Sequence, residues 1–396
     1  MRDILHRDYM LTTWRDRAAS AGSGVVTFVF NFDTVGGASL LNRGCSGTTG
    51  FWNSSTTRLE EDAKMKKKTL ALTLAGAILM FSLTGCGQRE REEGTYLIGI
   101  LQYFSHAALD ASREGFVNRL AELGFVAGDE GNVEFILYNP QRDAASGALM
   151  AARLAEARPD LVLTIATGAS QIMSRETSTI PIVITAVTSP VGADLVESNE
   201  RPGRNVTGVS DLTPVALQID LITRLLPEAR VIGLVYNAGE INSVIQANMA
   251  REAIRAKAGF SYVVGNVTGT ADIADVVQSI VGQVDVIYVP TCNTIAAAYP
   301  IVITTAEEAG IAVVAGEAGA VRVGALATEG IDYYLLGRQT ADMAARILRG
   351  EGVPATMPIQ WQQEPGTLVI NTATAARLGI PIPQAMLDTA GEIVTN

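Results

Sequence analysis

The sequence predicts an α/β fold of two lobes, each built on a parallel β-sheet covered by helices. From Tyr96 onward, short apolar runs alternate with longer segments of helical periodicity, which is the pattern of repeated βα units. The alternation forms two series of similar size, separated by the turn-rich stretch at residues 201–205. Because each series can form a doubly wound sheet, we expect two Rossmann-like lobes.

The first series contains four apolar runs, and we expect strands at residues 96–101, 133–138, 161–164 and 180–185. The helix between the first two strands places Leu109, Phe116, Leu120 and Leu123 on one face, and Gly124 follows as its C-terminal cap. A second helix is predicted over residues 144–157, because Pro159 prevents its continuation.

The second series predicts another set of alternating elements. Strands are expected at residues 231–236, 261–265, 284–289 and 312–314, and helices at residues 242–257, 271–282 and 294–310. Three elements remain after them: a short apolar run at 324–327, a helix at 333–348 and a strand at 367–370.

The placement of these last elements sets the domain organisation. We expect the helix to return to the first lobe and the strand to the second. Lobe 1 then comprises residues 95–207 and about 331–349, and lobe 2 comprises residues 208–330 and about 350–396. The chain crosses three times, near Gly208, near Gly330 and within residues 350–366, and such a hinge allows rotation while resisting twist.

An export signal precedes the lobes. Met65 and three lysines are followed by an apolar run from Leu70 to Leu83 and then by Leu83-Thr84-Gly85-Cys86. The run is short for a membrane span, which needs roughly 20 apolar residues, so we interpret residues 65–85 as a cleaved signal peptide. Residues 86–94 then form a charged tether, and residues 1–64 are interpreted as an upstream extension that is not native. The alternative is a genuine cytoplasmic extension, which would make the apolar run an anchor.

Composition excludes several classes of function. The chain has a net charge of −11, and residues 86–396 alone carry 20 basic and 34 acidic residues, a net charge of −14. A chain this acidic is a poor partner for nucleic acid. Beyond residue 86, Cys292 and His106 are the only cysteine and histidine, so we expect no disulfide, no metal site, no His-based triad and no cofactor.

Ligands of open parallel sheets sit outside the carboxyl ends of the strands, where helix N-termini present free N–H groups. The turns that follow the predicted strands are rich in hydroxyl and amide groups and poor in cations. From these turns we expect ligand contacts from Gln102, Tyr103, Phe104, Thr167, Ser170, Gln171, Thr188, Ser189, Tyr236, Glu240, Asn242, Ser243, Thr291, Asn293 and Glu317.

Simpler roles remain open for several of these residues. Taken singly, Ser170, Ser243 and Asn293 are ordinary helix caps. Glu240 and Glu317 either bind a ligand amine or hydroxyl, or form a surface charge or interlobe salt bridge. We interpret His106 as a residue that positions a helix N-terminus rather than as a general base.

Ordered motifs along the chain resemble the ABC transporter substrate-binding protein family that includes tryptophan/tyrosine uptake receptors. The segments that carry the resemblance are Gln102 to Asp110, Ile165 to Thr167, Thr185 to Thr188, Asn205 to Asp211, Tyr236 to Ser243, Gly324 to Ala327 and Asp332 to Gly337. The resemblance implies a type I periplasmic binding protein fold, a membrane permease and an ATPase as partners, and in several members an aromatic amino acid in the cleft. Leu83 to Cys86 likewise resembles the bacterial lipobox, which implies that Cys86 carries a lipid.

These resemblances predict a monomeric, non-enzymatic, solute-binding lipoprotein on the outer face of the cytoplasmic membrane. Two departures bear on the ligand. Where the family usually has aspartate, this chain has Ser189 and Cys292, so acidic groups for a ligand amine are missing there. Glu240 or Glu317 would have to compensate, or the ligand has no amine.

Three other functions compete with this interpretation. A Rossmann-type enzyme is disfavoured because no Gly-x-Gly-x-x-Gly follows the first strand. A LacI-like repressor shares the fold, but the export signal and the lack of a helix-turn-helix oppose it. A sensor that docks onto a membrane receptor would have the same sequence features and stays open.

Overall fold

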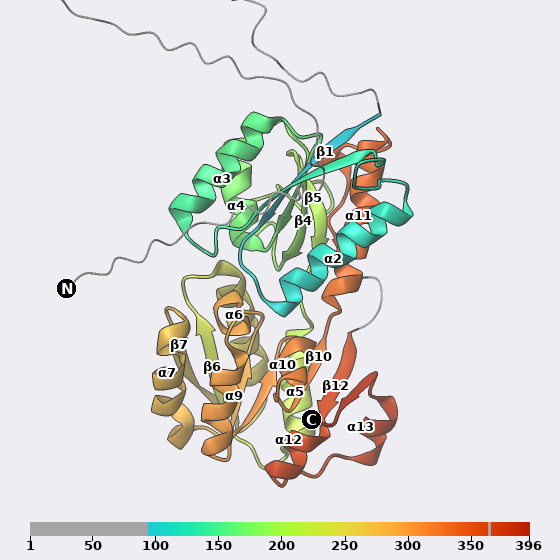
Figure 1. The fold of residues 1–396 in the computed structure, drawn as a ribbon. Helices are drawn as coiled ribbons and strands as arrows, with labels where there is room; N and C mark the ends of the chain where they lie inside the picture. Colours follow the sequence, from blue (N-terminus) through green and yellow to red (C-terminus); the bar gives the residue numbers. More distant parts are fainter. Residues whose placement is uncertain (1–93, 363–365) are drawn as a thin grey trace, which may run out of the picture. The chain divides into compact units, whose positions relative to one another are not determined.

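The computed structural model describes residues 94–362 and 366–396. The expected upstream extension, the signal peptide and Cys86 lie outside the described residues. These described residues belong to a single compact unit, which contains two α/β lobes (Figure 1).

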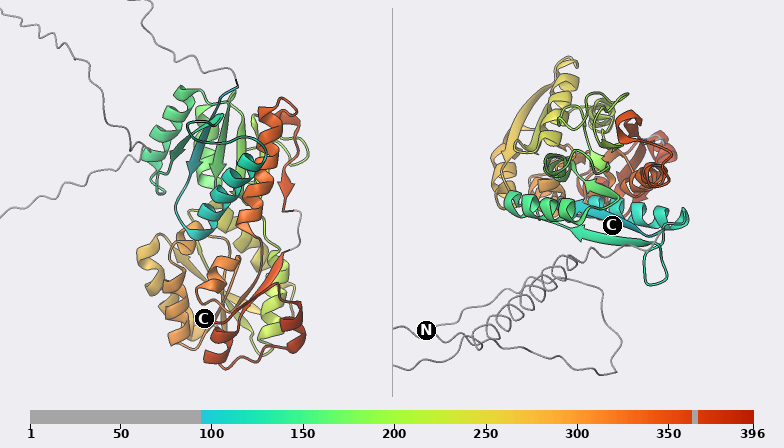
Figure 2. Two further views of the ribbon diagram at one scale, coloured as in Figure 1. Left: turned by 45° about the vertical axis from the view of Figure 1, so that its right-hand side comes forward. Right: turned by 90° about the horizontal axis from the view of Figure 1, so that it is seen from above.

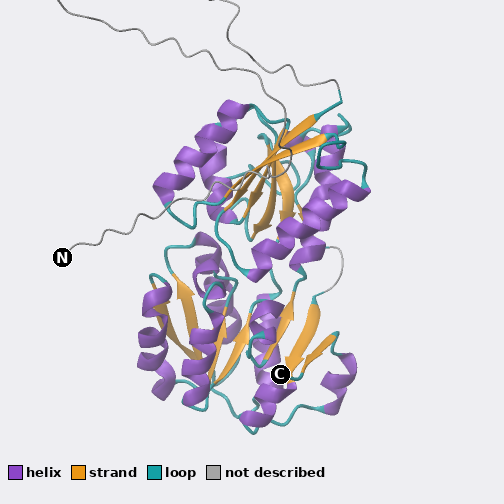
Figure 3. Ribbon diagram, viewed as in Figure 1, coloured by secondary structure: helices purple, strands orange, loops and turns teal. Residues whose placement is uncertain are grey.

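The first lobe is built on a six-stranded parallel sheet of order β11-β5-β4-β3-β1-β2. Its strands are β1 (Tyr96–Gln102), β2 (Val133–Tyr138), β3 (Leu161–Ile165), β4 (Ile182–Val187), β5 (Val206–Ser210) and β11 (Gln360–Trp361). Its helices are α2 (Ala107–Glu122), α3 (Ala144–Ala157), α4 (Thr167–Glu176) and α11 (Tyr333–Leu348). Helices α2 and α11 cover one face of the sheet, and α3 and α4 cover the other (Figures 1 and 3).

The second lobe is built on a seven-stranded sheet of order β13-β12-β10-β9-β8-β6-β7. Its strands are β6 (Val231–Asn237), β7 (Ser261–Val267), β8 (Val286–Val289), β9 (Ala312–Ala315), β10 (Ala327–Gly330), β12 (Thr367–Asn371) and β13 (Glu392–Val394). Its α-helices are α5 (Val215–Leu225), α6 (Ile241–Arg255), α7 (Ile273–Ile280), α8 (Asn293–Ala296), α9 (Tyr299–Glu308), α10 (Ala318–Arg322), α12 (Thr372–Arg377) and α13 (Gln384–Thr389). Single 3-10 turns lie at Thr270–Asp272, Val281–Gln283 and, beside the first sheet, Pro354–Thr356.

Most of the predicted elements are present with shifts of a few residues. The prediction of one helix over residues 294–310 is wrong, because the chain forms α8 and then α9, with Pro300 in the first turn of α9. A proline is tolerated there but not inside a continuous helix. The predicted fold class is confirmed, and both sheets are mainly parallel, with one antiparallel pairing in the second. Strand β12 pairs antiparallel with β10, since the chain re-enters the second lobe after visiting the first.

The expected lobe boundaries change at two of the three crossings. Strand β5 stays in the first sheet as far as Ser210, so the first crossing follows residue 210 rather than Gly208. Residues 350–361 were expected in the second lobe, but β11 pairs with β5, and Met357 and Ile359 are buried in the first lobe. The reason is that β5 offers a free sheet edge and an apolar surface. The third crossing therefore lies between β11 and β12.

Helix α11 returns to the first lobe and packs directly on α2 (Figure 2). Two glycines make this possible. A Cβ at Gly115 would lie 2.0 Å from the carbonyl oxygen of Tyr334, and a Cβ at Gly337 would lie 1.9 Å from that of Ser112. The backbones of the two helices are therefore in contact, which fixes α11 against α2 immediately after the chain leaves β10 of the second lobe.

Candidate ligand-binding site

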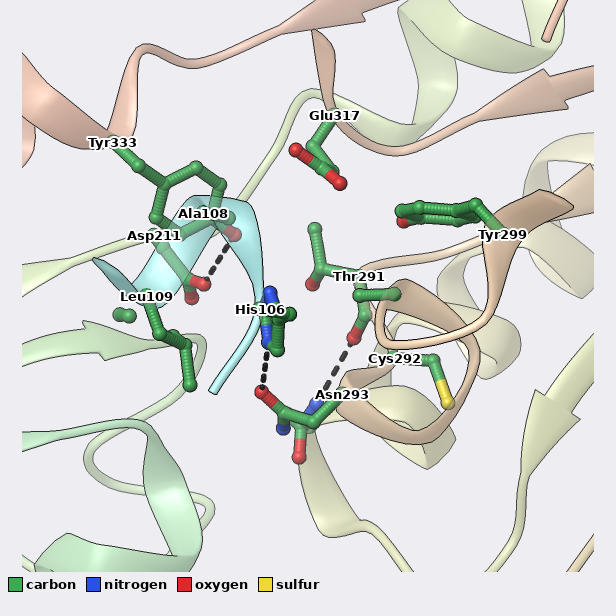
Figure 4. Close-up of a pocket in the computed structure, with 13 residues that line it drawn as sticks. His106, Ala108, Leu109, Asp211, Thr291, Cys292, Asn293, Tyr299, Glu317 and Tyr333 are labelled. Atoms are coloured by element: carbon green, nitrogen blue, oxygen red, sulfur yellow. Dashed lines mark hydrogen bonds between the residues drawn. The ribbon is translucent and has the colours of Figure 1, made fainter. Parts of the chain in front are cut away.

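A cavity lies between the lobes, at the carboxyl ends of strands from both sheets (Figure 4). In the described conformation the cavity is small, with a volume of about 20 Å³. That is room for about one water molecule, so an amino acid can enter only if the residues that line the cavity move apart. The lining comes from both lobes and the crossings, and consists of His106, Ala108, Leu109, Ala186, Asp211, Asn242, Thr291, Cys292, Asn293, Ala296, Tyr299, Glu317 and Tyr333. None of these lining residues is a lysine or an arginine.

Asp211 is one of two buried carboxylates in the cavity. It follows β5 directly and is 4% exposed. Its two oxygens accept hydrogen bonds of 2.8 Å from the hydroxyls of Thr188 and Tyr333. Burial raises the pKa of Asp211, and these two hydrogen bonds oppose the shift only in part.

Glu317 is the second buried carboxylate and is 5% exposed. It is the N-cap of α10 and accepts a hydrogen bond of 3.0 Å from the backbone N–H of Gly319. Burial raises its pKa, and the negative charge of Asp211 adds to the shift. The hydroxyl of Tyr299 is buried beside Glu317 and close enough to lower the pKa of that carboxyl, although the separation is too long for a hydrogen bond in this structure. The upper part of the cavity in Figure 4 is therefore acidic and only partly hydrogen-bonded.

Glu240 has a different role. Its carboxylate accepts hydrogen bonds from the backbone N–H groups of Asn293 and Thr294, both at 2.9 Å, and from the side chains of both residues. It thereby caps the N-terminus of the short helix α8. These bonds occupy both carboxylate oxygens of Glu240. That Glu240 meets a ligand amine or hydroxyl stays a prediction.

Two side chains of the first lobe contact this capped helix end. The Nε2 atom of His106 lies 3.2 Å from Oδ1 of Asn293, and the guanidinium of Arg142 donates to the hydroxyl of Thr294. Arg142 also lies over the ring of Phe104, at 4.6 Å from its centroid. Burial lowers the pKa of His106 despite its bond to Asn293. These contacts connect the two lobes beside the cavity.

The amino-acid sequence between residues 97 and 394 matches the family model of the ABC transporter substrate-binding proteins. This match covers most of the chain. The chain belongs to this family. Its members are substrate-binding proteins, not enzymes.

Relatives with known names support the same assignment. The chain is 35% identical over 323 residues to a tyrosine-binding protein of Clostridioides difficile, covering 79% of this chain and 92% of that protein. A domain of Streptococcus pneumoniae solved in complex with L-Trp has 35% identity and a TM-score of 0.72, covering 76% of this chain and all of that one. A ligand-free, open substrate-binding protein of Clostridium difficile has 37% identity and a TM-score of 0.60 over 76% of this chain and 100% of its own. The fold of this substrate-binding protein is that of the type I periplasmic binding proteins, as expected.

Of the fifteen side chains predicted to contact the ligand, the cavity of this substrate-binding protein is lined by Asn242, Thr291, Asn293 and Glu317. Thr188 and Ser243 stand directly behind the lining. Thr188 donates to Asp211, and the hydroxyl of Ser243 accepts from Asn242. Asn242 itself donates a hydrogen bond of 2.9 Å to the carbonyl of Thr291.

The other predicted residues do not line the cavity, and most of them have local partners. In the first lobe, Gln102 donates to Asp110, Tyr103 packs against Gly168, and Phe104 lies under Arg142. Ser170 bonds to Thr164 on β3, Gln171 donates to Ala193, and Ser189 accepts from the N–H of Gly192. Thr167 is buried at the start of α4, and its hydroxyl has no partner among the described residues. In the second lobe, Tyr236 accepts from Arg251.

Sequence reasoning missed Asp211, Tyr299 and Tyr333, and assigned no ligand contact to His106 and Cys292. Asp211 follows a strand and Tyr333 begins the helix after β10, so the strand-end rule would have selected both if β5 and β10 had been read as strands. No such signal marks Tyr299, which follows the short helix α8. Cys292 is buried, and burial raises the pKa of its thiol to about 12.

The described part of the chain contains no group of three or more His, Cys, Asp or Glu residues able to hold a metal ion. Within residues 94–362 and 366–396, no helix is both long and apolar enough to cross a membrane.

Proposed function

We propose that this substrate-binding protein captures a free aromatic amino acid between its lobes and delivers it to an ABC permease. The observation that carries the proposal is the interlobe cavity, which combines buried carboxylates, tyrosine rings and a free helix N-terminus. Relatives at 35% identity add support, since one is named a tyrosine-binding protein and another was solved with L-Trp.

The N-terminus of α2 is suited to the ligand carboxylate. Its N-cap residue, His106, makes no side-chain capping bond, and Ala108 and Leu109 of its first turn line the cavity. The free N–H groups and the positive end of the dipole of a 16-residue helix attract an anion. The rings of Tyr299 and Tyr333 and the side chain of Leu109 supply the apolar and aromatic contact for the ligand's side chain.

Closure around the ligand fits the contacts between the lobes. His106 and Arg142 of the first lobe reach Asn293 and Thr294 of the second. At nearly equal identity, the TM-score is 0.72 with the L-Trp complex and 0.60 with the open, ligand-free relative. We therefore treat the described conformation as a closed form, whose lobes have to move apart before a solute can enter.

The segment before the lobes supplies the proposed location. We propose that Met65 starts the natural chain, that residues 65–85 are removed on export, and that Cys86 then carries a lipid anchor. The protein would act as a monomer on the outer face of the cytoplasmic membrane, with a permease and an ATPase as partners. Mass spectrometry of the N-terminal peptide tests this: a diacylated Cys86 is expected, and an intact peptide spanning residues 80–90 would contradict it.

The proposed ligand class is tested by thermal unfolding of the purified chain with tryptophan, tyrosine, phenylalanine, other amino acids and sugars. A ligand at 100 times its dissociation constant stabilises the fold by about 2.7 kcal/mol. We expect a selective rise with one or more aromatic amino acids. A rise with sugars alone would contradict the proposal.

A membrane sensor remains the alternative use of the same site. Uptake of radiolabelled aromatic amino acid by cells separates the two functions. Loss of uptake on deletion of this gene supports import, whereas unchanged uptake with altered signalling supports the sensor.

A further inference from the structure

The cavity lining holds two buried carboxylates and neither a lysine nor an arginine. Asp211 and Glu317 are 4% and 5% exposed, and they are near enough for the charge of Asp211 to act on Glu317. Arg322 also acts on Glu317, but its guanidinium is paired with Glu392 at 2.6 and 2.9 Å and does not line the cavity. Two carboxylates in one buried cavity repel each other and lose much of their hydration, an unfavourable arrangement unless a cation joins them.

The hydrogen bonds that Asp211 and Glu317 make within the protein use only part of the capacity of their carboxylates to accept hydrogen bonds. An ionised carboxylate offers about four acceptor positions. Glu317 uses one for the N–H of Gly319, and Asp211 uses two for Thr188 and Tyr333. The buried hydroxyl of Tyr299 interacts with Glu317 at a distance too long for a hydrogen bond, so it can still turn to a ligand. Free acceptors thus remain on three oxygen-bearing side chains around one space (Figure 4).

We infer that Glu317, Asp211 and Tyr299 form the subsite that binds a primary ammonium group of the ligand. The inference rests on the proposed function and adds the group that the protein selects for. An ammonium brings one positive charge and three N–H donors, which matches two carboxylates and a hydroxyl. Ser189 and Cys292, which stand where the family usually has aspartate, then do not prevent recognition of the amine. The acidic groups are supplied instead by Asp211 at the first crossing and by Glu317, the N-cap of α10.

Glu240 is not part of the ammonium subsite, because its oxygens are held by Asn293 and Thr294 and it does not line the cavity. His106 also faces the cavity, and burial keeps the neutral form of its ring favoured. The cavity therefore offers a negative region to the amine, while the free N-terminus of α2 offers a positive one to the carboxylate. Such a polarised site favours a zwitterion over either of its singly charged analogues.

Calorimetric titration of the purified full chain tests the inference with three probes of one shape: L-tryptophan, indole-3-propionate, which lacks the amine, and tryptamine, which lacks the carboxylate. The same set is run with tyrosine and its analogues. We expect removal of the amine to weaken binding by about 30-fold or more, since a hydrogen-bonded ion pair is lost from a buried site. We also expect proton release on binding of the amino acid, seen as a heat that depends on the buffer, because an ammonium stabilises the ionised form of Glu317.

Glu317→Gln and Tyr299→Phe are expected to weaken amino-acid binding, by about 10-fold or more for the first and about 3-fold or more for the second. Both should leave the affinity for indole-3-propionate within about 3-fold. Glu317→Gln should also abolish most of the proton release. Glu329→Gln, the same change at a partly buried carboxylate of β10 outside the cavity, is the matched control. It should change neither the affinity for the amino acid nor the proton release. Tyr299→Phe removes a single oxygen, so it tests the subsite even if Glu317→Gln destabilises α10.

The outcomes separate the two proposals. Equal binding of tryptophan and indole-3-propionate would leave the proposed function in place and overturn the ammonium subsite. Binding of tryptamine but of neither amino acid would overturn the proposed function and support the subsite. Binding of none of the probes, or variants with unchanged selectivity, would contradict the inference.

Discussion

The hydroxyl of Tyr333 donates a hydrogen bond of 2.8 Å to a carboxylate oxygen of Asp211, and the two residues lie at two of the chain's crossings between the lobes. Asp211 follows β5 of the first sheet, whereas Tyr333 begins α11 just after β10 of the second. Both side chains line the cavity. The hinge itself therefore contributes part of the binding site, so ligand contacts and lobe rotation involve the same residues.

Tyr333→Phe should lower the free energy of unfolding by about 1–3 kcal/mol, because it removes a buried hydrogen bond to a carboxyl group. Equilibrium denaturation measures the change. Tyr334→Phe is the control, since the Tyr334 hydroxyl lies at the surface, where it accepts a hydrogen bond of 3.2 Å from Asn118. Equal effects of the two substitutions would contradict a special role of the Asp211 contact.

Gly337→Ala should destabilise the protein by about 1–3 kcal/mol or more, since the new Cβ would lie 1.9 Å from the carbonyl oxygen of Ser112. Helix α11 would have to move away from α2. Gly282→Ala provides the control, because a Cβ there has no neighbour within 4 Å and the backbone angle is not positive. Urea unfolding that gives the same midpoint for Gly337→Ala and the parent would show that the helices separate at little cost.

Arg142→Ala should weaken ligand binding by about 3- to 10-fold, because it removes the interlobe contact to Thr294 and the stacking on Phe104. Arg142 and its neighbour Gln141 both have positive φ angles, 66° and 50°, a costly backbone conformation for residues other than glycine. Such strain is consistent with a side chain held in place for closure.

Titration calorimetry and small-angle scattering check the role of Arg142. The scattering profile with saturating ligand should correspond to a larger open fraction in Arg142→Ala than in the parent. Arg153→Ala, at an exposed position on α3, is the control. Unchanged affinity together with unchanged scattering would exclude a part for Arg142 in closure.

The stability of the ligand-free protein should depend on pH through Glu317. Burial raises its pKa above that of the unfolded chain, so the folded state holds the proton to higher pH. Stability from this group is then greatest below its unfolded pKa, about 4, and is lost as pH rises through the folded value. The pKa of Asp211 is shifted in the same direction by burial. Groups such as Glu122, whose pKa is lowered to about 2 by Arg338 and Arg119, act in the opposite direction.

A comparison with Glu317→Gln isolates this effect, because the amide does not titrate. The stability of Glu317→Gln relative to the parent should increase from pH 5 to pH 8 when measured by urea denaturation without ligand. Glu308→Gln, at an exposed position on α9, should show no such trend. A difference between Glu317→Gln and the parent that is constant with pH would mean that Glu317 titrates alike in the folded and unfolded chains.

The elements that were predicted well are those whose signal is local. Strand β2 and helices α3 and α11 begin and end where the apolar spacing and the flanking proline or turn residues indicate. The two-lobe α/β fold followed from their alternation. The elements that were missed or misplaced depend on distant partners: β11 is two residues long and is a strand only because β5 offers a free edge.

The residues of the candidate site likewise divide into those that a local sequence pattern identifies and those that depend on distant partners. The rule that ligands lie at strand ends selected Asn242, Thr291, Asn293 and Glu317, which do line the cavity. The amino-acid sequence could not tell which other polar side chains would be occupied by neighbours, as Glu240 is by the N-terminus of α8. It also could not place Asp211, Tyr299 and Tyr333 round one space, since they come from a crossing, a helix start and a returning helix. Local patterns determined which segments fold; long-range packing, which only the three-dimensional structure contains, decided which polar groups remain free for a ligand.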